Sequence, residues 1–178
     1  MAHGDWYFKD WEERTQVQPN GRTKKEYIYT GKYYRIPSPA LKNKLLHLVL
    51  FLAFFICTVW LNLLPISRET IRHSRALVLL ALAPGIFWGI GVFNLCFAPA
   101  QMTYRHYHQS FRRMKIACPL ALACTLISLV LTIYDAVKIS ITGIPLLFWL
   151  LLILALAAAI CAWILILLCP CRLESQSK

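Results

Sequence analysis

Charged residues are scarce in this sequence, and acidic ones are the scarcest. Only 15% of the 178 residues are Asp, Glu, Lys or Arg, and the 8 acidic residues are outnumbered by 19 basic ones, which leaves a net charge of +11. Apolar residues make up 58% of the chain. Soluble globular domains carry about 25% charged residues and a smaller apolar share. The composition therefore excludes an ordinary soluble domain, and something other than water must solvate much of the chain.

Recognisable catalytic motifs are also lacking. The sequence has no His-Glu-x-x-His, no Gly-x-Ser-x-Gly, no glycine-rich phosphate loop and no Cys-x-x-Cys pair of the kind that thiol oxidoreductases use. Its few acidic residues are scattered along the chain. An enzyme is thus the function class that the sequence supports least, and we expect neither a cofactor nor a bound metal ion.

Long apolar runs, by contrast, are abundant. Four stretches approach or exceed the roughly 20 apolar residues that a helix needs to cross a hydrocarbon core about 30 Å thick. We predict an all-α membrane protein with four transmembrane helices, at residues 45–66, 76–98, 116–137 and 146–169. The chain then divides into an aromatic and basic N-terminal tail, a transmembrane domain and a short C-terminal end: residues 1–44, 45–169 and 170–178.

The basic residues predict the orientation in the membrane. Nine Lys and Arg lie in the tail, four in the segment 102–115 and two at the C-terminal end, against four on the other side of the spans. Because Lys and Arg are enriched in cytoplasmic loops, both termini and the segment 102–115 are expected to be cytoplasmic, in a multi-pass protein of the cell membrane. In this setting the positive charge indicates the lipid surface as its partner and not nucleic acid.

Short connections predict how the helices pair. Only about nine residues separate the first two spans, and the link between the last two is equally short, so each pair should form an antiparallel hairpin. In the second span Ala81, Gly85 and Gly89 form a ridge of small residues that allows close helix contact. Pro84, within this ridge, should kink the helix.

The tail carries weaker signals. The stretch "HGDWYFKDWEER" is compatible with a helical turn or two, and the following Pro-Asn-Gly indicates a turn. The stretch "KEYIYTGKYYRIPSP" is rich in β-favouring Tyr and Ile around Thr30 and Gly31, and it predicts a small hairpin or an extended strand there. A lone two-stranded hairpin is marginal in water, so it would need the membrane surface, other loops or a partner chain.

The third span has the most organised polar feature. Small and polar residues recur on one stripe of the helix at spacings of 3 and 4: Cys118, Ala121, Thr125, Ser128, Thr132 and Asp135. A packing seam is the favoured interpretation, because such residues let helices approach closely and hydrogen-bond. The alternative is a proton or cation pathway that ends on Asp135. Asp135 lies near the outer end of its helix, which favours an ion pair with Lys138 or with an arginine of the 67–75 connection.

The segment "MTYRHYHQSFRRMK", residues 102–115, predicts an amphipathic helix at the membrane interface between the second and third spans. Tyr104, Tyr107, Phe111 and Met114 share one face, and Arg105, His108, Arg112 and Lys115 share the adjacent one.

Each face of this helix has an expected contact. The basic side chains should lie at the anionic leaflet: Arg105, Arg112, Arg113 and Lys115. Tyr104, Tyr107 and Phe111 are candidates for contact with a partner. His106 and His108 point in nearly opposite directions on a helix, so they cannot share a metal ion.

The seven cysteines lie within the spans or at their ends, so a reduced set is expected. Cys169 and Cys171 belong to a Cys-Pro-Cys-Arg sequence where the fourth helix should meet the cytoplasm. A soft-metal site and a lipidated cysteine pair are two functional interpretations. The favoured one is a helix ended by proline with two inert cysteines, because two thiols are too few for a closed tetrahedral metal site.

The motifs "YTGKYYR" and "MTYRHYHQSFRRMK", with the two spans between them, carry a family resemblance. Over roughly residues 27–135 the chain resembles small membrane proteins of Gram-positive Firmicutes, which have a tyrosine-rich tail, paired spans and a Met-Thr-x-x-x-Tyr loop that ends in Arg-Arg. That family has no assigned activity, so the resemblance implies no functional residue. The fourth span and the Cys-Pro-Cys end lie outside the matched part.

We therefore expect an accessory or interaction component of the membrane that acts through its tail and basic segment. Its expected partners are the lipid bilayer and a membrane protein or further copies of this chain. The alternative is a small transporter or channel component, with the polar stripe of the third span lining a path.

Overall fold

Four long helices dominate the structure, a computed structural model that describes residues 11–17, 23–64, 72–139 and 144–174. They are α2 (Ala40–Leu63), α3 (Arg72–Phe97), α5 (Arg113–Ile139) and α6 (Leu146–Leu168). By length and composition each is able to cross a membrane. The prediction of an all-α protein with four apolar spans is confirmed, with helix bounds within about five residues of those expected.

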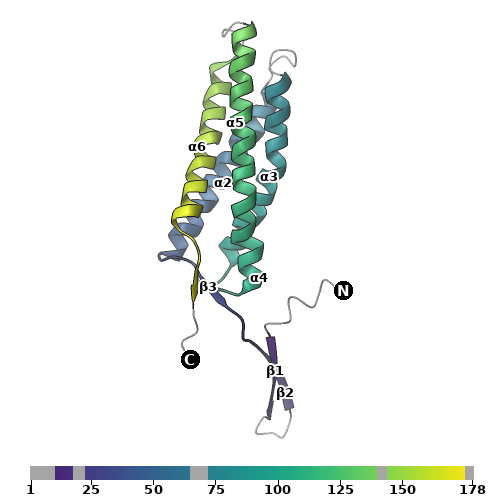
Figure 1. The fold of residues 1–178 in the computed structure, drawn as a ribbon, viewed down its shortest axis with the longest axis vertical. Helices are drawn as coiled ribbons and strands as arrows, with labels where there is room; N and C mark the ends of the chain where they lie inside the picture. The colour runs from purple at the N-terminus through teal and green to yellow at the C-terminus, as the bar shows by residue number, and fades with distance from the viewer. Residues whose placement is uncertain (1–10, 18–22, 65–71, 140–143, 175–178) are drawn as a thin grey trace.

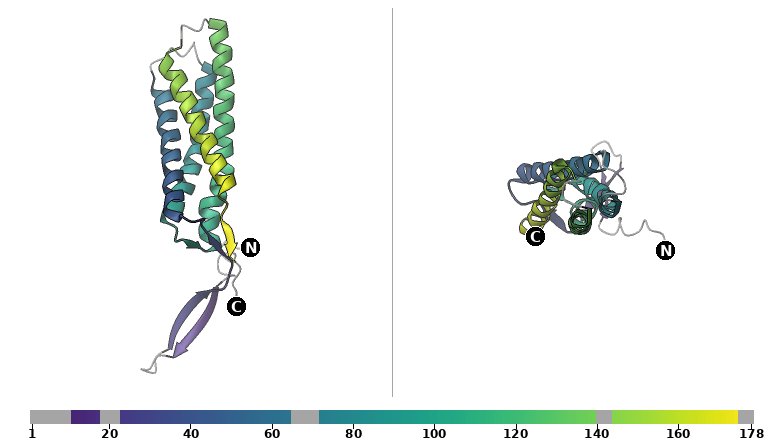
Figure 2. Two further views of the ribbon diagram at one scale, coloured as in Figure 1. Left: turned by 90° about the vertical axis from the view of Figure 1, so that its left-hand side faces the viewer. Right: turned by 90° about the horizontal axis from the view of Figure 1, so that it is seen from above.

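The four helices pack side by side as a bundle (Figure 1). Each contacts two neighbours, in the order α2, α3, α5, α6 and back to α2 (Figure 2). The most extensive contacts join α3 to α5 and α2 to α6. The contacts between the two expected hairpins are therefore more extensive than those within each hairpin.

Small residues of α3 allow it to approach α2 closely. Gly85 and Gly89 are buried, and a methyl group at Gly89 would lie 2.5 Å from Cζ of Phe51. At Gly85 it would lie 3.1 Å from Cε1 of Phe54. Trp88, between the two glycines, is buried against both phenylalanine rings. The ridge expected from the sequence thus receives the aromatic side chains of α2.

A small sheet covers one end of the bundle, which we call the capped end. Its central strand is β3 (Tyr33–Arg35), flanked antiparallel by β4 (Gln101–Met102) and β5 (Arg172–Glu174). Tyr34 lies opposite both Met102 and Leu173 in the register. The sheet ties the N-terminal tail, the link after α3 and the C-terminal end together, and Met102 is fully buried beneath it.

A separate hairpin projects from the capped end, away from the helices (Figure 1). It pairs β1 (Trp11–Val17) with β2 (Thr23–Tyr29) in antiparallel register. Of the two forms expected for the stretch around Thr30 and Gly31, extended strand is present on both sides of these residues. A hairpin centred on them is not, because β2 pairs with the preceding strand while β3 joins the other sheet. The helical turn expected within residues 3–14 is wrong for residues 11–14, which belong to β1. The rest of that stretch and the Pro-Asn-Gly turn lie outside the described residues.

The segment 102–115 is not a separate helix. After β4 it forms α4 (Tyr104–Tyr107), then a π-helical turn η1 (His108–Arg112), and continues into α5. The helical run Tyr104–Lys138 has 35 residues and is about 52 Å long at 1.5 Å per residue. It is longer than the roughly 30 Å hydrocarbon core of a bilayer, so its α4 end belongs with the capped end.

Candidate functional site

The segment 102–115 has a buried side and an exposed side in the structure. Met114 is fully buried and Phe111 is 2% exposed, both within the main apolar core. The four cations occupy the outside of the same helical run, where their side chains are exposed: Arg105, Arg112, Arg113 and Lys115. Lys115 also lies 5.7 Å from the ring centroid of Phe111. We call these four residues the basic surface.

The aromatic face is covered by this chain's own tail. Tyr34 of β3 stacks on Tyr107 at a centroid distance of 4.1 Å with rings 8° from parallel. The backbone N–H of Tyr104 donates a hydrogen bond of 3.1 Å to the hydroxyl of Tyr29. Of the three side chains expected to face a partner, Phe111 is therefore in the core and Tyr107 is covered, whereas Tyr104 is 39% exposed.

The π-helical turn is supported by α3. Asn94 donates a side-chain hydrogen bond of 3.3 Å to the carbonyl of Gln109, within η1. Three residues earlier, Gly91 lets the helices meet so closely that a methyl group there would lie 3.0 Å from the carbonyl oxygen of Ser110. Such π-helical turns are often found at functional sites. The turn thus packs closely against α3, while its last residue, Arg112, is exposed.

Lys44 of α2 stabilises the end of α3. Its ammonium donates hydrogen bonds to the carbonyls of Cys96, at 3.3 Å, and of Ala98. These carbonyls lie at the C-terminal end of α3, where backbone acceptors lack helical partners and the helix dipole favours a cation. The ammonium of Lys44 thus binds backbone carbonyls at the capped end, whereas the side chain of Lys42 is exposed.

The two histidines have local partners. Arg112 Nη1 donates to Nε2 of His108 at 2.6 Å, and Nδ1 of His106 lies 2.9 Å from the hydroxyl of Thr103. Within the described part of the chain, no three His, Cys, Asp or Glu side chains lie close enough to hold a metal ion. The spacing of His106 and His108 predicts that their side chains point in different directions, and their different partners agree with this.

The polar stripe of α5 is buried in the bundle along its whole length, from Cys118 to Asp135. The hydroxyl of Thr125 donates to the carbonyl of Ala121 at 3.0 Å, and that of Thr132 donates to Ser128 at 2.8 Å. The thiol of Cys118 makes a weak contact of 3.7 Å with the carbonyl of Ala159 in α6. The threonine hydroxyls thus donate to carbonyls one turn earlier in their own helix, an arrangement open to any Thr inside a helix.

Asp135 lies at the far end of this stripe and is 8% exposed. Lys138, one turn later, lies 4.7 Å from the ring centroid of Tyr134. The other cations expected near Asp135 are the arginines of residues 67–75, whose side chains lie outside the described residues. The ion pair expected for Asp135 therefore stays a prediction.

The Cys-Pro-Cys sequence follows α6 directly. The backbone N–H of Cys169 still donates to the carbonyl of Leu165 at 2.9 Å, and Pro170 follows it. Cys171 packs against the main core. Burial raises the pKa of Cys171 to about 11, although nearby Lys115 acts in the opposite direction. A thiol of this kind stays protonated at neutral pH, which makes it a poor nucleophile and metal ligand.

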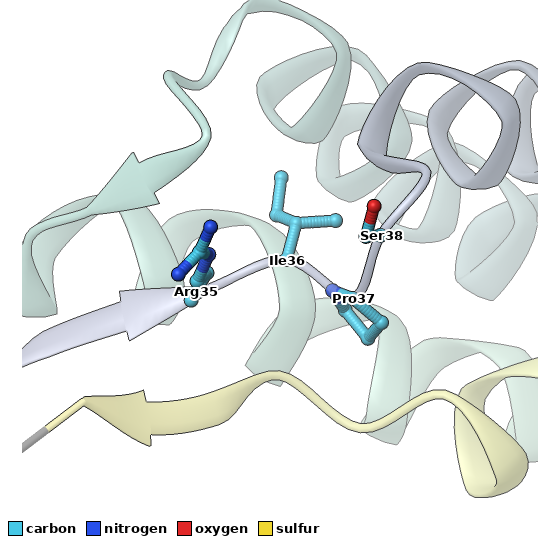
Figure 3. A pocket seen from close by; sticks show the side chains of 4 residues that line it. All are labelled: Arg35, Ile36, Pro37 and Ser38. Atoms are coloured by element: carbon cyan, nitrogen blue, oxygen red, sulfur yellow. The ribbon is translucent and has the colours of Figure 1, made fainter.

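A shallow cavity of about 320 Å³ opens at the capped end. It is lined by the last residue of β3 and the three residues that follow it toward α2, as Figure 3 shows: Arg35, Ile36, Pro37 and Ser38. Ile36 is buried, and its backbone N–H donates to the carbonyl of Ala100 at 3.2 Å. The cavity reflects how this stretch crosses the end of the bundle, and its charged side chain, Arg35, is exposed.

Sequence patterns identified the basic surface and the polar stripe, but they missed the contacts that hold the capped end together. The lysine that binds the end of α3 and the asparagine that binds η1 act across 52 and 15 residues of sequence, so no local pattern marks them. No protein-family model, no curated protein and no solved structure matches the chain.

Proposed function

We propose that this protein is a membrane-embedded interaction component that presents the β1–β2 hairpin and the basic surface on one side of a cell membrane. The observation that carries the proposal is the hairpin itself. It extends from the capped end beyond the four apolar helices (Figure 2), and its described contacts with the rest of the chain centre on Tyr29. An element in this position is available to another molecule.

The charge distribution supports a cytoplasmic capped end. The basic surface, Lys42 and Arg35 lie there, and the described residues between Thr30 and Tyr134 include no Asp or Glu. Each Lys or Arg near an anionic leaflet contributes about 1 kcal/mol of attraction, and cytoplasmic segments are enriched in these residues. Both termini are then cytoplasmic, because the tail and the C-terminal end meet in the β4–β3–β5 sheet.

The hairpin has the properties of a docking element. A two-stranded sheet has two outer edges with backbone groups to which an added strand can pair. Trp11 is exposed, and Tyr27 is 61% exposed, while Glu13 and Lys25 form an exposed ion pair of 2.6 Å across the strands. Because an isolated hairpin is marginally stable, a protein partner that pairs with its edge or covers its aromatic side chains would stabilise it. We propose no catalytic step for this chain.

Removal of the hairpin tests the proposal. Deletion of residues 1–27 leaves Tyr29 and β3 in place, so the bundle should keep its stability while the proteins cross-linked to the full-length chain in its native membrane are lost. The control exchanges the ion pair, with Glu13→Lys and Lys25→Glu in one variant, which keeps the hairpin and should retain the cross-links. An unchanged set of cross-linked proteins after the deletion would contradict the proposed docking role.

The orientation is tested separately. Single cysteines are introduced at Thr15 and within residues 67–75 of a chain without its native cysteines, and intact cells are treated with a maleimide that does not cross membranes. We expect labelling only in the 67–75 connection. Labelling at position 15 from outside would reverse the orientation.

A transporter or channel component is the second candidate, favoured by the buried stripe from Thr125 to Asp135. Its support is weaker, because the hydroxyls of Thr125 and Thr132 are engaged by carbonyls of their own helix. Flux of protons or small cations into proteoliposomes, abolished by Asp135→Asn, would support this candidate. Absence of flux with the unaltered protein, or flux that Asp135→Asn leaves unchanged, would exclude it.

A further inference from the structure

A groove of about 320 Å³ runs along the outside of the bundle between α3 and α5. It is lined by two residues of α3 and four of α5: Pro84, Phe87, Arg113, Ile116, Ala117 and Leu120. Neither the proposed docking role nor the packing of the bundle uses it. All of these side chains except that of Arg113 are apolar.

The shape of the groove follows from the sizes of its side chains. Ala117 is 5% exposed and forms the floor, because its methyl group leaves the space between the two helices unfilled. Phe87, Ile116 and Leu120 are all more than half exposed and form the walls. The groove thus opens toward the surroundings of the bundle, which in a membrane are lipid chains.

The charge of the groove lies at one end. Arg113, Ile116 and Leu120 recur at spacings of 3 and 4, so they lie along one face of α5. Arg113 is the first residue of α5 and is closest to the capped end, whereas Leu120 lies about 10 Å further into the span at 1.5 Å per residue. No residue of α3, and none between Tyr104 and Tyr134, is acidic. The groove therefore combines an apolar body with a cation at the end that is nearer to the capped end.

We propose that this groove binds one anionic glycerophospholipid, with an acyl chain between α3 and α5 and its phosphate on Arg113. The proposal rests on the membrane insertion proposed above. Basic pockets between transmembrane helices on the cytoplasmic side are known to hold anionic head groups, and a guanidinium suits phosphate because it donates two parallel hydrogen bonds. A transmembrane helix of another protein fits less well, since close helix contact needs small residues at the rim and this rim consists of large ones.

The test measures lipid binding to the purified full-length protein in detergent. Native mass spectrometry follows titration with phosphatidylglycerol and with phosphatidylcholine of the same acyl chains. We expect phosphatidylglycerol to bind more tightly, and Arg113→Gln to weaken it about fivefold, in line with one cation at an anionic lipid surface. The matched control is Arg112→Gln, which removes a neighbouring cation of the basic surface that is held by His108 and does not line the groove. It should weaken the binding clearly less than Arg113→Gln does.

A second pair of variants tests the apolar part. Leu120→Trp fills the groove and should weaken the binding of both lipids, whereas Leu126→Trp is roughly 240° further around the helix and should have no effect. Equal effects of Arg113→Gln and Arg112→Gln, or no effect of Leu120→Trp, would overturn the site. A change of oligomeric state caused by Leu120→Trp alone would instead assign the groove to a second copy of this chain. Deletion of residues 1–27 should leave lipid binding unchanged, so this test and that of the docking role can fail independently.

Discussion

The capped end and the middle of the bundle use polar groups in different ways. At the capped end, hydrogen bonds join different elements: Lys44 of α2 binds the end of α3, and Asn94 of α3 binds η1. In the middle, the hydroxyls of Thr58 and Thr125 donate to carbonyls one turn earlier in their own helices. The first kind of bond specifies how elements are placed, whereas the second leaves helix placement to the packing of apolar and small side chains.

This difference has a physical reason. In lipid, polar side chains are stabilised by any nearby acceptor, and the closest is a carbonyl of the same helix. Near a bundle end, helix termini leave backbone carbonyls without partners, and a side chain from another element can satisfy them. Four predictions test the comparison, from the largest expected effect to the smallest.

The first prediction concerns how well the capped end excludes water. Because burial raises the pKa of Cys171 to about 11 from an ordinary value of 9.0, its thiolate fraction at pH 8 should be about one hundredth of that of an exposed thiol. A variant with Cys171 as its single cysteine should therefore react with iodoacetamide about a hundredfold more slowly in mild detergent than in denaturing detergent. Its rate should continue to rise with pH up to about 11, and a plateau near pH 9 in mild detergent would show that the capped end is open to water.

The second prediction compares two glycines of α3. A methyl group at Gly91 would lie 3.0 Å from a backbone oxygen and 2.8 Å from Cγ of Met114, whereas at Gly85 its nearest neighbour is the ring edge of Phe54. A backbone atom yields less than a ring, so Gly91→Ala should lower the free energy of unfolding by about 2 kcal/mol. Gly85→Ala should be closer to neutral, because the helix propensity of alanine offsets a small shift of the ring. Urea titration in mixed micelles measures both, and equal effects would contradict the distinction.

The third prediction tests the contact between α2 and α3 at the capped end. Lys44→Met keeps the length of the side chain but removes the ammonium that binds the carbonyls of Cys96 and Ala98. The free energy of unfolding should fall by about 1.5 kcal/mol, as for other hydrogen bonds from charged groups. Lys42→Met is the control and should change it by less than about 0.5 kcal/mol, since Lys42 is exposed. Similar losses for both variants would mean that the positive charge stabilises the protein by a general surface effect, and not by hydrogen bonds to the end of α3.

The fourth prediction concerns the middle of the bundle. Thr125→Val and Thr132→Val remove hydroxyls that donate only within α5 in the described contacts. Each variant should change the free energy of unfolding by less than about 0.5 kcal/mol, because no bond between helices is lost. A loss as large as that of Lys44→Met would show that these hydroxyls bind across the bundle and would end the contrast between the two regions.

Much of the bundle could be predicted because its signals are local. Length and hydropathy define an apolar span, and a spacing of 3 and 4 defines a helix face, so the burial of Thr125 and Phe111 follows from the sequence once the helices are drawn. The strand pairing could not be predicted in the same way. Tyr29 pairs with Trp11, and Tyr34 pairs with Met102 and Leu173, and these partners lie far apart along the chain.

The sequence by itself determined four apolar helices, a basic segment with one buried and one exposed side, and the scarcity of acidic residues. Periodicity and composition act within one turn or one span, and they need no partner element. Only the tertiary structure decided that the tail covers Tyr107, that Lys44 binds the end of α3, and that Ala117 opens a groove beside Arg113. These features depend on contacts between side chains of separate elements, and those contacts are determined by the packing of the whole chain.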